Sequence, residues 1–224
     1  MTKPITAKQF HQSDGTEQWR VLGEGACTFF RSGSFDTSLR LAQAIGGLDG
    51  VADLEPDLDV RRDGVTVRLI EDTDDYYGLV ESHIELARQV TATAGRLGLV
   101  GEHPDLQTVQ LTIDALDIPA LLPFWRAVLD YRDREPALGN VEDLVDPRGR
   151  GIAIWFQQMD EPREQRNRIH FDVWVTPEQF DARVAAALAA GGRLVSDAYA
   201  PSWTVLADAE GNEACVCSAT GRDD

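Results

Sequence analysis

Few side chains in this 224-residue sequence are suited to chemistry near neutral pH. Among the four histidines, His170 is the best placed, because it lies in a strand-like segment where an imidazole can act as acid, base or hydrogen-bond donor. Cys215 and Cys217 alternate on one face of a later strand, and a cysteine thiolate is a capable metal ligand. The alternatives are structural: His170 is then a neutral histidine packed on a strand or lining a pocket, and the cysteines are small buried hydrophobes.

The other histidines and two of the tryptophans carry weaker signals. His83 lies between apolar positions of a predicted helix, which is typical of a surface or core residue, and His11 and His103 lie in polar connecting segments. Trp155 and Trp203 are candidates for the apolar walls of a ligand pocket, since such pockets are built largely of apolar and aromatic side chains. Tryptophan is also ordinary core, so both interpretations stay open.

The overall composition excludes several classes of function. The formal net charge is −17 and the pI is about 4.5, so the surface repels phosphate backbones and nucleic acid is not an expected partner. The longest apolar runs fall short of a membrane span, and residues 1–18 are too polar for a signal peptide. Three cysteines without a secretion signal indicate a reducing cytoplasm. The sequence has no phosphate-binding glycine loop, no nucleophile elbow and no Cys-x-x-Cys redox motif.

The first half predicts strands and helices that follow a polar lead-in, residues 1–18. Ser34 is a suitable N-cap for a helix that ends at Gly46-Gly47. Two alternating runs joined by Asp63-Gly64 predict a β-hairpin, and that dipeptide favours a type I′ turn. The full set of predicted segments is a strand or strand pair over 19–30, the helix after Ser34, the hairpin strands 57–61 and 65–69, an acidic loop over 71–75 and an amphipathic helix from Val80 to Leu97.

The second half repeats one pattern twice, beyond a linker at residues 99–104. In each copy a strand leads into a helix, and further strand-like segments follow. The segments are 106–113, 118–129 and 151–157 in the first copy, and 169–175, 177–190 and 203–217 in the second, with the last turn at 208–212. We therefore expect an internal duplication of a strand–helix–strands unit, and two such units can pair their sheets around a shared concave space.

Four segments of this second half form a recognisable set. They are Gln110 to Ile113, Pro123 to Leu129, Arg168 to Val173, and Trp203 to Glu213, which contains the turn Asp208-Ala209-Glu210-Gly211-Asn212. Together they resemble the glyoxalase-like group of the vicinal-oxygen-chelate superfamily, whose turn signature has a proline where this chain has Ala209. The resemblance implies a duplicated βαβββ domain over residues 105–220 that encloses a small-molecule pocket.

The resemblance also implies positions for a functional site. Metal-using members of the superfamily take one ligand from each of four strands, and these positions fall on Gln110, on Gln157 or a neighbour, on His170 and on Cys215. Two glutamines are weak neutral ligands, and no carboxylate stands where family enzymes place a glutamate, so we expect no metal and no other cofactor. His170 is then the expected catalytic residue, in a substrate-binding pocket formed by Gln110, Trp155, Gln157, Trp203 and Cys215.

Three segments of the first half, Leu48 to Arg62, Val65 to Leu69 and Gly78 to Ala87, resemble the pterin carbinolamine dehydratase family. This resemblance implies an antiparallel sheet packed against helices over residues 19–98. The family uses histidines for proton transfer, and two of them precede a proline where this chain has Leu54-Glu55-Pro56. A third family histidine falls in the acidic run that contains Asp72.

The missing histidines leave two interpretations of the first half. Glu55 and Asp72 are a rewired catalytic acid–base pair, or the domain is degenerate and is kept for stability or dimerisation. Losing one positioned acid–base group typically costs about 10²–10⁴ in rate. We therefore expect little dehydratase activity.

The expected protein is an α+β chain of two domains, 19–98 and 105–220, that forms a homodimer in the cytoplasm and binds a small molecule. In the leading hypothesis, an aromatic or heterocyclic metabolite enters the C-terminal pocket and is bound, or is converted by a metal-free lyase or isomerase reaction that uses His170. In the second hypothesis the chain sequesters a ligand without turnover. The third is residual dehydratase chemistry through Glu55 and Asp72.

Overall fold

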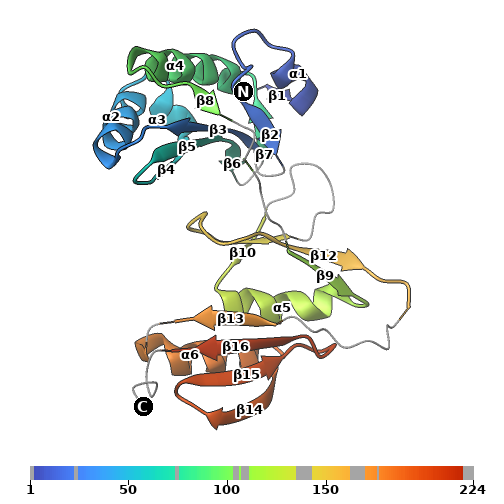
Figure 1. Cartoon of the computed structure of the whole chain (residues 1–224). Coiled ribbons are helices and arrows are strands. Elements are labelled where there is room, and N and C mark those ends of the chain that lie inside the picture. The colour runs from blue at the N-terminus through green and yellow to red at the C-terminus, as the bar shows by residue number, and fades with distance from the viewer. Residues whose placement is uncertain are drawn as a thin grey trace. The chain divides into compact units, whose positions relative to one another are not determined.

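The computed structural model describes residues 3–22, 25–73, 76–102, 106, 111–134, 143–161, 170–175 and 177–218 (Figure 1). The chain divides into two compact units, the first formed mainly by Met1–Thr108 and the second by Val109–Arg134 and Asn140–Asp224. Both units mix helices with largely antiparallel sheets, so the α+β class is confirmed. None of the helices in these ranges is long and apolar enough to cross a membrane.

The first unit is built on an antiparallel sheet with the order β2-β3-β5-β4. Its strands are β2 Arg20–Leu22, β3 Gly25–Arg31, β4 Asp57–Val60 and β5 Gly64–Leu69, and the short strand β8 Gly101–Glu102 also pairs with β3. A separate small sheet joins β1 Pro4–Ile5, β7 Tyr76–Val80 and β6 Glu71–Thr73. The helices are α1 Ala7–His11, α2 Phe35–Gly46, α3 Val51–Leu54 and α4 Ser82–Arg96.

Local signals explain the longer helices of this unit. The Ser34 side chain accepts a hydrogen bond from the Thr37 amide, so the predicted N-cap and the predicted end of α2 are confirmed. In α4 the amide of Leu99 donates to the carbonyl of Ala94 beyond Gly98, whose φ of +74° suits glycine at a helix C-terminus. The apolar sides of both helices and the inner face of the sheet form one buried core.

Residues 3–18, the described part of the expected lead-in over 1–18, do not form a loose segment. They contain β1 and helix α1, which begins with a reciprocal capping box between Thr6 and Gln9. The Phe10 side chain is fully buried in the core of the first unit. Ile5 packs against the same core, so two apolar residues anchor a segment whose overall composition is polar.

Three further expectations for this unit are corrected. In the hairpin, the Arg61 amide donates to the Gly64 carbonyl, so Arg62 and Asp63 form the turn, and neither Asp63 nor Gly64 has the positive φ of a type I′ turn. Glycine is needed at 64 because a Cβ there would collide with the Phe29 ring. The acidic loop contains strand β6, paired with the unpredicted β7, and the expected linker contains strand β8.

The second unit contains two copies of one topology. The first copy runs β9 Leu111–Ala115, α5 Ile118–Leu129, β10 Arg132–Asp133, β11 Asp143–Val145 and β12 Ile154–Gln158. The second runs β13 Phe171–Trp174, α6 Pro177–Ala189, β14 Arg193–Tyr199, β15 Trp203–Ala207 and β16 Glu213–Cys217. In both sheets the first strand pairs in parallel with the fourth, and the third and second follow in antiparallel order. We call the two copies the first and second module.

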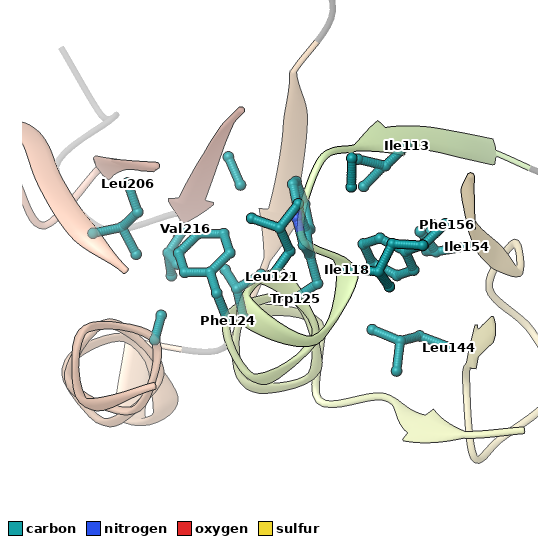
Figure 2. Close-up of a cluster of buried hydrophobic side chains, with 14 of the residues drawn as sticks. Ile113, Ile118, Leu121, Phe124, Trp125, Leu144, Ile154, Phe156, Leu206 and Val216 are labelled. Atoms are coloured by element: carbon teal, nitrogen blue, oxygen red, sulfur yellow. The ribbon is translucent and has the colours of Figure 1, made fainter. Parts of the chain in front are cut away.

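A single core joins the two modules (Figure 2). Helix α5 lies between side chains from both sheets, with Ile113 and Ile154 of the first module on one side and Leu206 and Val216 of the second on the other. This core fixes one face of each sheet against the helices. Because side chains alternate along a strand, the opposite faces carry the candidate functional residues.

Candidate functional site

The outer face of the second sheet gathers the chemically capable residues of the second module. In the parallel ladder of β13 and β16, Asp172 lies directly opposite Cys215. His170 precedes Asp172 by two residues, which directs both side chains to the same face. On the other side of β16, Val205 lies opposite Cys215. Val205 and Cys215 are distant in sequence from His170 and Asp172, and only the strand register brings them together.

His170, Asp172 and Cys215 form a compact cluster. One ligand atom from each side chain lies within 4.8 Å of the other two, and His170 Nε2 is 3.4 Å from Asp172 Oδ1. The His170 and Asp172 side chains are about half exposed, with fractions of 55% and 53%, whereas Cys215 is buried. The exposed imidazole of His170 thus lies next to the Asp172 carboxylate, and both lie close to the buried thiol of Cys215.

The Cys215 thiol is protonated at neutral pH in the chain alone. Burial, together with the neighbouring Asp172 carboxylate, which accepts a hydrogen bond from the thiol, raises the pKa of Cys215 to about 11. Cys215 therefore acts as a weak hydrogen-bond donor, and it lacks the lowered pKa that activates cysteine nucleophiles. Asp172 stands between the two other groups and can accept from both.

An aromatic pair lies on the same face, one step along the strands. Trp203 is opposite Cys217 on one side and opposite Tyr199 on the other. The Trp203 and Tyr199 rings stack with centroids 4.3 Å apart and an interplanar angle of 17°. Tyr199 is 60% exposed, so this flat apolar surface is open to solvent beside the His170 cluster. A planar ligand can stack there while a polar substituent reaches the cluster.

The first module places different residues on its corresponding face. The parallel ladder of the first module begins with Leu111 opposite Ile154, and that of the second begins with Phe171 opposite Ala214. When these two pairs are taken as equivalent, Trp155 occupies the position of Cys215. The predicted residues Trp155 and Gln157 are both exposed on this sheet, opposite Thr112 and Asp114.

Of the predicted substrate-binding residues, the structure places Cys215 in one cluster with His170, and Trp203 on the same face of the second sheet, opposite Cys217. Trp155 and Gln157 are on the first sheet. Gln110 lies outside the described residues.

The turn between β15 and β16 has a structural role. The buried Asp208 carboxylate accepts hydrogen bonds from the Trp125 indole at 3.0 Å, from the Asn212 side chain at 2.7 Å and from two backbone amides. Glu210 accepts from the amides of Leu116 and Asp117, just before α5. The hydrogen bonds of this turn thus connect the second sheet to the N-terminus of α5 and to Trp125 on the buried face of that helix.

The candidate acid–base residues of the first unit lie in separate places. Glu55 ends α3 with a left-handed backbone (φ 38°) and is exposed, and Asp72 is exposed in β6 of the small sheet. His83 is fully buried at the start of α4, where its Nδ1 accepts a hydrogen bond from the Val80 amide. Burial lowers the pKa of His83 to about 4, so this histidine is a neutral core residue.

A surface groove of about 770 Å³ also belongs to the first unit. Its charged walls are already paired: Lys3 lies 3.4 Å from Glu81, and Arg88 lies 3.4 Å from Glu85. The groove is widely open and none of the residues predicted for a site lines it. We place the candidate site at the His170 cluster, because it combines an imidazole, a carboxylate and a thiol, and not at this groove.

The fold of the second unit defines a duplicated βαβββ protein with its polar residues on the sheet faces opposite the helices. Residues 110–217 match the family model described as a glyoxalase-like domain. Residues 110–217 are therefore a glyoxalase-like domain, and this part of the sequence-based interpretation is confirmed. The likeness of the first half to pterin dehydratases stays a prediction.

Solved structures with the same kind of domain show low sequence identity. A glyoxalase/bleomycin resistance protein/dioxygenase family enzyme from Burkholderia phytofirmans PsJN is 21% identical, with a TM-score of 0.41, over 49% of this chain and 95% of that one. A glyoxalase/bleomycin resistance protein from Albidiferax ferrireducens T118 is 20% identical, with a TM-score of 0.39, over 49% and 95%. The fosfomycin resistance protein FosX from Mesorhizobium loti is 13% identical, with a TM-score of 0.40, over 52% and 94%. No curated protein sequence matches this chain.

The donor set differs from the one expected for a metal in this superfamily. Gln157, a weak neutral ligand, is exposed on the first sheet, whereas Asp172 supplies a carboxylate next to His170 and Cys215. Imidazole, carboxylate and thiolate together suit a borderline divalent ion. The expectation of no metal rested on the two neutral glutamines and on the lack of a carboxylate at the family's glutamate positions; Asp172 lies at another position, so that expectation stays a prediction.

Sequence reasoning missed Asp172 and Tyr199 as site residues. Asp172 had a usable signal. It follows His170 by two positions, and side chains two positions apart in a strand lie on the same face. Tyr199 had none, because β14 was not predicted and its ladder with β15 is irregular.

Proposed function

We propose that the second module binds a small aromatic or heterocyclic metabolite on the outer face of its sheet. The observation that carries this proposal is the presence on one face of the His170–Asp172–Cys215 cluster and the stacked Tyr199–Trp203 pair. The aromatic pair offers stacking area, and the cluster offers hydrogen-bonding groups of both kinds. Ligand sites combine apolar walls with a few such convergent polar groups.

His170 is the residue proposed to act on the bound ligand. Its imidazole is solvent-reachable, and the Asp172 carboxylate 3.4 Å away can orient the ring for a proton transfer. In this proposal the protein is a lyase or isomerase that moves a proton at the ligand's polar group. A glyoxalase-like domain that only sequesters its ligand is the alternative, and it keeps the same face without turnover.

A direct binding experiment tests the proposal. A set of soluble aromatic and heterocyclic compounds is screened against the full chain by ligand-observed NMR, and affinities of hits are measured by calorimetry. Trp203→Ala is expected to weaken binding about fivefold or more, because stacking on one aromatic ring contributes about 1 kcal/mol or more. Leu194→Ala is the control, since Leu194 is exposed on the same sheet but pairs with Leu206 of the core face.

The role of His170 has its own test. Once a binding compound is found, its conversion by the wild type and by His170→Ala is followed by mass spectrometry. Removal of a general acid–base group should lower turnover by about 10²-fold or more. Unchanged turnover in His170→Ala would show that His170 has no catalytic role, and no conversion by the wild type would favour the sequestering alternative.

Residual dehydratase activity is a separate proposal for the first unit. Glu55 is exposed at the end of α3, whereas Asp72 is exposed in β6 of the small sheet, so their placement does not strengthen it. An assay with a 4a-hydroxytetrahydropterin decides it, because no acceleration over buffer eliminates the activity. The proposed homodimer is checked by light scattering coupled to size-exclusion chromatography.

A further inference from the structure

We propose that the surface groove of the first unit binds a short zwitterionic peptide, with the peptide's ammonium group at Glu81 and its carboxylate at Arg88. The groove has a volume of about 770 Å³, within the range of small-ligand sites, and it is lined by the first turns of α4 together with Lys3 and Ser13. Its charges suit binding rather than catalysis. Because the groove belongs to the first unit, the proposal does not depend on the function proposed for the second.

Three residues on one face of α4 set the chemistry of the groove. Glu81, Ile84 and Arg88 follow one another at spacings of three and four residues, so their side chains lie along one face of the helix. An acidic group, a half-buried aliphatic group and a basic group thus succeed one another along the groove. This order is complementary to a ligand with an ammonium group at one end, an apolar middle and a carboxylate at the other end.

Helix geometry sets the length of that ligand. Arg88 follows Glu81 by seven positions, which corresponds to about 10 Å along the axis at about 1.5 Å per residue. An extended chain spans at most about 3.3–3.6 Å per residue, so the two charged ends of a tripeptide lie about 10 Å apart. The hydroxyl groups of Ser13 and Ser82, which also line the groove, can form hydrogen bonds with the peptide's amide groups.

The Arg88 side chain is held in place while part of its guanidinium stays free. Its Nε donates to the Asp14 carbonyl at 2.6 Å, and its Nη1 lies 3.4 Å from the Glu85 carboxylate. Among the residues that the structure describes, Nη2 has no hydrogen-bond partner. A guanidinium fixed in this way offers its remaining N–H groups to a carboxylate with little further loss of side-chain entropy.

The ion pairs that already lie in the groove are weak enough to be exchanged for ligand contacts. The Lys3–Glu81 pair is 3.4 Å long with side chains 70% and 60% exposed, and the Arg88–Glu85 pair is 3.4 Å long with side chains 43% and 61% exposed. Such exposed pairs add little to stability, because water screens them and ordering two long side chains costs entropy. The net charge of −17 disfavours anionic ligands, whereas a zwitterion carries no net charge to repel.

Titration of the full-length protein with trialanine, followed by heteronuclear NMR, tests the proposal. We expect saturable shifts of the amide signals of Ser82, Ile84 and Arg88. N-acetyl-trialanine amide, which has the same length but no charged ends, should bind much more weakly. Arg88→Gln and Glu81→Gln should each weaken trialanine binding about two- to fivefold, the effect of removing one exposed ion pair.

A variant outside the groove controls for the change in net charge. Arg40→Gln removes an exposed arginine of α2 that pairs with Asp36 at 2.8 Å, and it should bind trialanine as the wild type does. The proposal is overturned by any of three results: no saturable shift in the wild type, equal binding of trialanine and its blocked form, or the same affinity in Arg88→Gln, Glu81→Gln and Arg40→Gln.

Discussion

The buried His83 should make the free energy of unfolding of the first unit depend on pH. Replacing this one residue should remove that dependence. His83 is fully buried, and its Nδ1 accepts a hydrogen bond from the Val80 amide at 3.2 Å, so the ring proton is on Nε2. Within the described part of the chain, Nε2 has no hydrogen-bond partner. A second proton would place a charge in the core and turn the Nδ1 acceptor into a donor that faces the Val80 amide.

The size of the pH-dependent loss of stability follows from the pKa of His83. Burial lowers it from the ordinary 6.5 to about 4 in the folded chain, so the unfolded chain binds the proton more tightly. The stabilisation by neutral His83 is complete above about pH 6.5 and is lost as the pH falls toward 4. The full loss is about 3 kcal/mol, of which about 2 kcal/mol is lost between about pH 7.5 and pH 5.

The assay compares the wild type with His83→Asn, whose side-chain oxygen can still accept from the Val80 amide but does not titrate. Hydrogen–deuterium exchange of α4 peptides in urea reports the opening free energy of the first unit at each pH. The variant should lose about 2 kcal/mol less than the wild type between about pH 7.5 and pH 5. His11→Asn, which replaces an exposed histidine that accepts from the Val21 amide, should retain the wild-type dependence. Equal pH dependence of wild type and His83→Asn, or an NMR titration of His83 near pH 6.5, would refute the reasoning.

Three further substitutions test the packing of the two units. Asp208→Ala leaves the buried Trp125 indole without its acceptor and should destabilise the second unit by about 3 kcal/mol in calorimetric unfolding. Gly64→Ala puts a methyl group into the Phe29 ring and should destabilise the first unit by about 1–3 kcal/mol in urea unfolding. Gly95→Ala, at an exposed helical glycine where a Cβ meets nothing within 4 Å, should instead stabilise it by about 0.5–1 kcal/mol, and a loss of stability there would contradict the helix-propensity argument.

Local signals in the sequence determined much of the secondary structure. The N-cap Ser34 and the glycines Gly46 and Gly47 predicted the two ends of α2. The hydrophobic spacing of residues 118–129 predicted both ends of α5. The repeated strand–helix pattern revealed the duplication before any strand pairing was known. These features depend on residues a few positions apart, so a sequence displays them directly.

Interactions between distant residues could not be obtained in this way. Phe10 is buried only because the core of the first unit receives it, and Gly64 is needed only because Phe29 of another strand lies against it. Burial of His83 and its hydrogen bond to Val80 likewise depend on how α4 packs.

The candidate site shows the same division. His170 and Cys215 stand out in the sequence as residues that can do chemistry, and their strands were predicted from alternation. That Asp172 joins them, and that Trp203 stacks on Tyr199 on the same sheet face, depends on which strands pair and in which register. Register is set by packing of the whole sheet against α5 and α6, a long-range property, and for that reason only the tertiary structure decided it.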